Sequence, residues 1–110
     1  MVLCASSAYE KKFYLNENFE GLPQHVKDEL KIMCVLFTED VGGVLSLEFD
    51  ENGNLELNTS ADEGDLLYDE IGSVLKIKQM QQEKQELFES LETYYKVFFL
   101  GEDIEDDNGD

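Results

Sequence analysis

The stretch 44-VLSLEFDENGNLELNT-59 decides the fold, because it predicts an antiparallel hairpin in a fixed register. Apolar and polar residues alternate on both sides of an Asp-Glu-Asn-Gly-Asn turn, a pattern typical of two strands with one buried face. Since the apolar residues must share that face, we expect Phe49 opposite Leu55 and Leu47 opposite Leu57. This register leaves a three-residue loop that ends at Gly53, which we expect in the left-handed conformation.

An amphipathic helix is predicted upstream of this hairpin, between Pro23 and Gly42-Gly43. Proline suits the first helical position, where no backbone N–H is needed, and the glycine pair ends the helix. Apolar residues recur at helical spacing between these limits: Val26, Leu30, Met33, Cys34, Phe37 and Val41. Three more lie on the far side of the helix: Ile32, Val35 and Leu36. They predict that the second half of this helix is covered on more than one face.

Two short strands are predicted at the N-terminus, over 2–6 and 11–16, and they join as a hairpin through 7–10. In the second strand, Phe13 alternates with Lys12 and Tyr14, which places apolar and polar residues on opposite sides. Both hairpins together predict a four-stranded antiparallel sheet. We expect one apolar face covered by helices and one polar face open to solvent.

A long C-terminal helix is predicted over 66–100, which contains no proline and a single glycine, Gly72. The residues from Ser60 to Glu63 have the pattern of a capping box that leads into this helix, and Gly64 can delay its start to Asp65. An unbroken helix of this length would reach roughly 50 Å and would overhang a domain of about 100 residues.

The apolar residues of this helix form two stripes on different sides. The first stripe contains Leu67, Ile71, Val74 and Leu75. The second, roughly 150° away around the helix, contains Ile77, Met80, Leu87, Phe88, Leu91, Tyr94, Tyr95 and Phe98. Either the helix is continuous and packs its first half on its own domain and its second half on another chain, or it bends near 79–82 and folds back as a hairpin. The absence of glycine and proline there favours the continuous helix.

A homodimer interface is therefore predicted in the second half of the helix, through Leu87, Phe88, Leu91, Tyr94, Tyr95 and Phe98. Rigid, amphipathic aromatic residues of this kind are enriched in protein interfaces. The alternative is that these residues form ordinary core beneath a helix that folds back.

The chain is very acidic, with 26 Asp and Glu against 8 Lys and Arg and a formal net charge of −18. Such a field repels nucleic acid phosphates and anionic membrane surfaces, so we expect neither as a partner. It favours a basic protein partner or divalent cations. Six of the last nine residues are acidic, and 102–110 is predicted to be a disordered tail after a single domain over 1–101.

The sequence also predicts a cytoplasmic location. The apolar start, Met1 to Cys4, lacks the basic flank of a signal peptide, and no run of about 18 apolar residues could span a membrane. Cys4 and Cys34 form no CxxC pattern, and two thiols of this kind suit a reducing compartment.

Candidate chemical sites are few. Glu48 and Glu56 should face each other on the polar side of the sheet, where they could bind a divalent cation or act as an acid–base pair. No other ligand type converges there, and a solvated sheet face is favoured. The 50–54 turn lacks the glycine and glutamate that a calcium loop needs, and His25 has no nucleophile nearby. The residues give no positive support for catalysis, and no cofactor is expected.

Two runs carry a family resemblance: GLPQHVKDELKIMCVLFTEDVGGVLSLEFDENGNLEL and EGDLLYDEIGSVLKIKQMQQEKQELFESLE. They resemble a family of small uncharacterised acidic proteins of Gram-positive bacteria, over most of the chain except the tail. The resemblance implies a cytoplasmic bacterial protein of unknown function and assigns no functional residues. The order helix, hairpin, helix is also similar to roadblock-type dimerisation domains, but those continue with further strands.

These observations predict a two-layer α+β domain in the order β-β-α-β-β-α. The leading functional hypothesis is a non-catalytic interaction or regulatory module that self-associates through the long helix and presents an acidic surface to a basic partner. Its rival is a protein that binds a small molecule or divalent cation, with or without hydrolytic chemistry, through Glu48 and Glu56.

Overall fold

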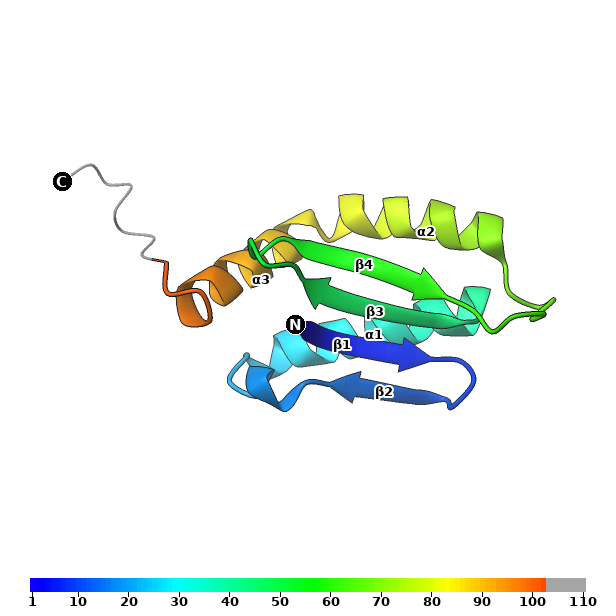
Figure 1. Cartoon of the computed structure of the whole chain (residues 1–110), viewed down its shortest axis with the longest axis horizontal. Coiled ribbons are helices and arrows are strands. Elements are labelled where there is room, and N and C mark those ends of the chain that lie inside the picture. The colour runs from blue at the N-terminus through cyan, green and yellow to red at the C-terminus, as the bar shows by residue number, and fades with distance from the viewer. Residues whose placement is uncertain (103–110) are drawn as a thin grey trace.

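A computed structural model describes residues 1–102, which form a sheet covered on one face by helices (Figure 1). The first hairpin consists of β1 (Val2–Ser7) and β2 (Lys12–Leu15), and a 3-10 turn, η1 (Glu17–Phe19), leads to α1 (Gln24–Val41). The second hairpin, β3 (Val44–Phe49) and β4 (Leu55–Ser60), precedes α2 (Glu70–Glu83) and α3 (Gln85–Phe98).

The predicted α+β class and the four-stranded antiparallel sheet are confirmed, with the strand order β2-β1-β3-β4. The element order differs in detail, because three α-helices replace the two expected from the sequence. The predicted acidic tail, 102–110, lies outside the described residues except for its first position.

The β3–β4 hairpin has the register that the sequence predicts. Leu47 pairs with Leu57, Glu48 with Glu56 and Phe49 with Leu55. The backbone N–H of Asp50 donates to the carbonyl of Asn54 over 2.9 Å, and Gly53 closes the turn with a φ of +86°. The apolar residues occupy every second position, and they share one face only in this register. The alternation therefore sets how the two strands pair.

β1 lies at the centre of the sheet and pairs with both β2 and β3. Its register with β3 shifts between Val2 and Cys4. Because of this irregularity, two successive residues, Leu3 and Cys4, are both fully buried. The Cys4 sulfur lies 3.9 Å from that of Cys34 on α1, and both cysteines are free thiols inside the core.

A stack of aromatic rings joins the sheet to α3. The rings of Phe49 and Tyr95 are nearly parallel, with centroids 4.2 Å apart. Phe19 from η1 stacks on Phe99 with centroids 4.8 Å apart, and it is fully buried. Such contacts add to the gain from burying large rings.

The two stripes of the C-terminal helix are used in the opposite way to the one expected. The second stripe packs into the chain's own core, where Met80, Phe88 and Leu91 are buried. The first stripe faces outward, and Ile71 and Leu75 are 76% and 62% exposed. The first half of the helix does contact α1, but Ile77 and Met80 rather than the first stripe pack against the core, so the prediction was wrong about which residues make this contact.

The predicted limits of the long helix were also wrong. Asp69, not the segment from Ser60, caps the helix by accepting a hydrogen bond from the N–H of Gly72 over 2.8 Å. The helix breaks once, at Lys84, whose φ of −111° and ψ of 22° leave the helical region. It neither runs straight through nor folds back, since α3 continues along the long axis of the molecule (Figure 1).

β4 is an edge strand, and α3 covers one of its amides. The N–H of Leu55 points away from β3 and donates to the Glu92 carboxylate over 2.7 Å. This contact ties the start of β4 to the middle of α3 by a charge-assisted hydrogen bond.

The connection from β4 to α2 is tied to the first hairpin by Tyr9. The Tyr9 hydroxyl donates to the Asp65 carboxylate over 2.5 Å and accepts from the N–H of Asp62 over 2.8 Å. The Tyr9 hydroxyl, with help from the N–H of Leu67, holds the pKa of the Asp65 carboxyl below its usual range. Farther along, the N–H of Asp69 donates to the carbonyl of Val41 over 3.0 Å.

The Tyr9 contact makes part of the stability depend on pH. In Tyr9→Phe we expect the pKa of Asp65 to rise toward its ordinary value of about 3.9. A carboxyl with a lowered pKa in the folded state stabilises that state above its unfolded pKa, and this contribution is lost as pH falls through the folded pKa. The Asp65 part of the stability difference between the two proteins should therefore be present at neutral pH and shrink below about pH 4.

Carboxyl carbon NMR titration of both proteins measures these pKa values directly. Asp50 provides an internal control, because its pKa is lowered chiefly by the backbone N–H of Asn54 and should not change in Tyr9→Phe. An Asp65 titration that is the same in both proteins would contradict the assignment.

Candidate functional site

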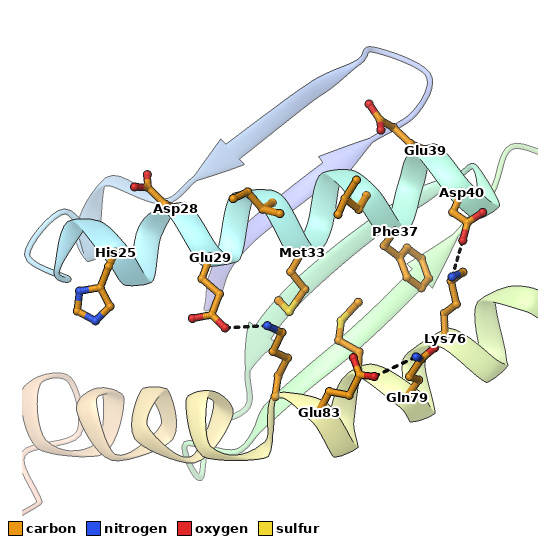
Figure 2. A pocket seen from close by; sticks show the side chains of 14 residues that line it. His25, Asp28, Glu29, Met33, Phe37, Glu39, Asp40, Lys76, Gln79 and Glu83 are labelled. Carbon is orange, nitrogen blue, oxygen red and sulfur yellow. Dashed lines mark hydrogen bonds and ion pairs between the residues drawn. The ribbon is translucent and has the colours of Figure 1, made fainter.

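A groove of about 960 Å³ runs between α1 and α2 (Figure 2). Its floor is apolar and consists of Met33 and Phe37 from α1 and Met80 from α2, all of which are buried. The volume lies within the range of roughly 300–1,000 Å³ that is common for binding sites. The two walls of the groove are separate helices.

One wall carries exposed apolar side chains. Ile32 and Leu36 from α1 line the groove and are 59% and 58% exposed. The sequence predicted that the far side of this helix would be covered, and that prediction was wrong for these two residues. α2 meets α1 beside them rather than over them, because its contact residues face Met33 and Phe37.

Two ion pairs connect the helices across the groove. Lys84 contacts Glu29 over 2.8 Å, and Lys76 contacts Asp40; both pairs are drawn in Figure 2. The four side chains are between one third and about one half exposed, so each pair contributes at most about 1 kcal/mol. Their main effect is to neutralise both lysines of the groove.

The remaining charge of the groove is negative. Five carboxylates line it, from Asp28, Glu29, Glu39, Asp40 and Glu83. Only two of them have a lysine partner among residues 1–102. The groove thus combines an apolar floor with unbalanced carboxylates on its rim, and this favours an amphipathic cationic ligand.

The groove has no arrangement of groups that indicates catalysis. His25 lies at one end of it, as the first turn of α1 requires, and no cysteine or serine lines the groove beside it. Within the described part of the chain, no group of three or more His, Cys, Asp or Glu side chains could hold a metal ion.

Glu48 and Glu56 face each other as predicted, on the open side of the sheet. The Ser46 hydroxyl donates to Glu48 over 2.8 Å. The sheet separates this pair from the groove, so the two do not form one site. The pair has no third ligand of the kind that a metal site needs among residues 1–102.

The predicted interface residues divide into three groups. Phe88, Leu91 and Tyr95 are buried in the core of the same chain. Leu87 and Tyr94 are partly buried against that core. Phe98 alone of the six is largely exposed, at 70%. Most of this predicted surface is therefore occupied by the chain itself.

A different apolar surface is exposed. We call it the apolar band, and it consists of Leu66, Leu67, Ile71, Val74 and Leu75, with exposed fractions between 56% and 94%. It covers the connection before α2 and the outward side of its first turns. The sequence identified most of this set as the first stripe but assigned it to the core.

Sequence reasoning missed the groove itself. The sequence does contain a pattern that could have indicated it. On one side of α1, Ile32 and Leu36 are flanked by the acidic residues Asp28, Glu29 and Glu39. Acidic residues on both sides of an apolar ridge indicate contact with solvent rather than with a second layer of core.

Comparison with protein families places residues 1–103 in a family of unknown function, DUF6145. The chain belongs to this family. A DUF6145 domain spans both hairpins and all the described helices, so the groove and the apolar band are both parts of the family domain. No curated protein and no solved structure matched the chain. Within the described residues, no helix is both long and apolar enough to cross a membrane.

Proposed function

We propose that this DUF6145 protein is a non-catalytic interaction module whose α1–α2 groove binds a basic amphipathic helix of a partner protein. The observation that carries the proposal is the combination of the buried floor around Met33 and Met80 with five rim carboxylates and two already paired lysines. A helix in a groove uses apolar anchors on one face and complementary charges on its flanks.

The dimensions of the groove support a helical ligand. α1 has 18 residues, which gives it a length of about 27 Å. A partner helix of roughly four turns could lie along it, with anchors spaced at i, i+3 or i+4 and i+7. Ile32 and Leu36 are one turn apart on the rim, so they would contact successive anchors.

The overall charge of the protein supports a basic partner as well. A formal charge of −18 steers cationic surfaces toward the molecule and repels nucleic acid and anionic membranes. The finer assignments, a cytoplasmic location and a Gram-positive bacterial source, are part of this proposal. They are supported by two cysteines that are free thiols and by the family resemblance of the sequence.

We also propose that two copies associate through the apolar band. Its five side chains expose on the order of 400 Å² of apolar surface, at roughly 80–120 Å² per large aliphatic side chain. A standard interface buries about 800 Å² on each partner, and more than half of that is apolar. The apolar band therefore supplies most of the apolar area that a small dimer needs.

The charges beside the apolar band favour an antiparallel pairing of α2 with a second α2. If the two-fold axis passes at Val74, Lys78 of one copy lies next to Glu70 of the other. Lys78 is exposed and has no ion-pair partner in residues 1–102. This pairing would offset part of the repulsion between two strongly acidic molecules.

The groove proposal is tested with a designed peptide of about 15 residues that forms a helix with leucine on one face and lysine on the other. We expect it to bind, and we expect binding to weaken as salt is added, because the rim charges are solvent-exposed. In Ile32→Ser/Leu36→Ser, loss of two apolar anchors should lower the affinity about tenfold or more. Isothermal titration calorimetry measures both effects.

Two controls make this test specific. Tyr14→Ser removes an aromatic side chain that is 52% exposed on the open sheet face, and it should leave the affinity unchanged. A peptide with glutamate in place of lysine should not bind. Equal binding of the acidic peptide, or an equal loss in Tyr14→Ser, would reject the groove as the docking site.

Self-association is tested by two matched substitutions at exposed apolar residues. Leu75→Asp places a charge in the apolar band, and Phe98→Asp places one on the exposed end of the predicted second-stripe interface. We expect sedimentation equilibrium to give a dimer for the parent and Phe98→Asp and a monomer for Leu75→Asp. Dimerisation should strengthen with added salt, because salt screens the repulsion between the copies.

The reverse pattern, with Phe98→Asp monomeric and Leu75→Asp dimeric, would return the interface to α3. A monomer for the parent protein at all concentrations and salt levels would reject self-association through either surface.

A further inference from the structure

We propose that a second cavity, on the other flank of α1, binds a small organic anion with an apolar body. This inference goes beyond the proposed function and does not rest on it. The cavity has a volume of about 750 Å³ and lies between the first hairpin and the second half of α1, with Leu67 at its edge. We call it the lysine pocket.

Lysines are concentrated in this pocket although the chain has few of them. Lys11, Lys12 and Lys31 line it, out of 8 basic residues in the whole sequence. The ion pairs among residues 1–102 are made by other lysines. These three ammonium groups are therefore available for a ligand.

The carboxylates of the pocket do not cancel this charge. Glu39 and Asp40 line it, and Asp40 already pairs with Lys76. Three lysines against Glu39 give a local positive excess on a protein whose formal charge is −18. A local excess of the opposite sign is a feature that selects anions by direct contact rather than by the long-range field.

The backbone of the hairpin turn holds two of the lysines in place. Lys11 has a φ of 54°, which is rare for a residue with a side chain. The turn is fixed by a hydrogen bond from the N–H of Glu10 to the Ser7 hydroxyl over 3.2 Å and by one from the N–H of Ala8 to the carbonyl of Gly43 over 2.8 Å. This constrained turn places Lys11 and Lys12 at the rim of the pocket.

The rest of the lining indicates the body of the ligand. Ala8, Phe13, Val35 and Val41 supply apolar surface. Ser6 and Thr38 are buried and bond to each other over 2.8 Å, and the Thr38 hydroxyl also reaches the carbonyl of Val35 over 3.2 Å. Since these hydroxyls already have partners, the lysines determine which ligands are selected. The pocket therefore suits a carboxylate or phosphate group joined to a short apolar chain.

Four probes separate head group from body. Octyl phosphate and octanoate carry the anion and the chain, inorganic phosphate carries the anion alone, and octylammonium carries the chain with the opposite charge. Each is titrated below its micelle concentration into the full-length protein labelled with nitrogen-15. We expect saturable shifts at pocket amides with the two anionic amphiphiles, binding at least about tenfold weaker with inorganic phosphate, and none with octylammonium.

Variants link the binding to the lysines. In Lys11→Gln/Lys31→Gln we expect the dissociation constant for octyl phosphate to rise by about 4- to 25-fold, since one exposed ion pair is worth about two- to five-fold. Lys96→Gln is the matched control, because it removes a lysine on α3 that does not line the pocket, and it should change the constant less than about twofold. Unchanged amide shifts away from the pocket verify that each variant is folded.

Several outcomes would overturn the proposal. They are equal binding of octylammonium and octyl phosphate, an equal loss in Lys96→Gln, or no saturation with either anionic amphiphile. A fifth probe, a peptide of residues 102–110, tests whether the acidic end of a second copy is the natural occupant. If that peptide binds the pocket and the amphiphiles do not, the ligand class is wrong.

Discussion

The helical layer depends on the stacked rings of Phe49 and Tyr95, because this contact joins the end of β3 to α3. Phe19 stacks on Phe49 and Phe99 stacks on Tyr95, and these two rings also stack on each other to complete a cluster of four. Once α3 is fixed there, the adjoining end of α2 is positioned as well. α2 buries only Ser73 and Met80, whereas α3 buries Phe88, Leu91 and Tyr95. The wall of the groove is therefore held mainly from its α3 end, and the two partly exposed lysine pairs across it add little.

A wall with few buried side chains can shift at low free-energy cost, and ligand-binding elements are drawn from such weakly held parts of a fold. The break at Lys84 contributes to this, since α2 is not a rigid extension of α3. The same side chain forms the pair with Glu29, so the end of α2 is both a hinge and a contact point. Rearrangement of the groove around an incoming helix would act on these features while the aromatic stack stays intact.

The parts of the fold that the sequence predicts are those with a single geometric solution. Only one pairing of β3 with β4 puts Phe49 and Leu55 on the same face, and the main apolar stripe of α1 fixes which of its sides packs on the sheet. The two stripes of the last helices have no such solution, because both have helical periodicity. The choice between them depends on where the connection after β4 crosses α1, near Val41 and Asp69. The opposed positions of Glu48 and Glu56 could be predicted from the strand register. The groove could not be predicted, because it depends on pairs such as Glu29 and Lys84, which are 55 residues apart in the sequence.

The contact between Glu92 and the N–H of Leu55 bears on how the molecule behaves in a crowded solution. An edge strand with open amides is a template on which other strands can add without limit, and that is the usual start of fibrous aggregates. In β4 a carboxylate from the same chain occupies the first outward amide, and Glu56 adds a charge to the same strand. Growth of the sheet into a neighbouring molecule is thereby opposed at its start, whereas the proposed two-fold contact through the helices would close on itself.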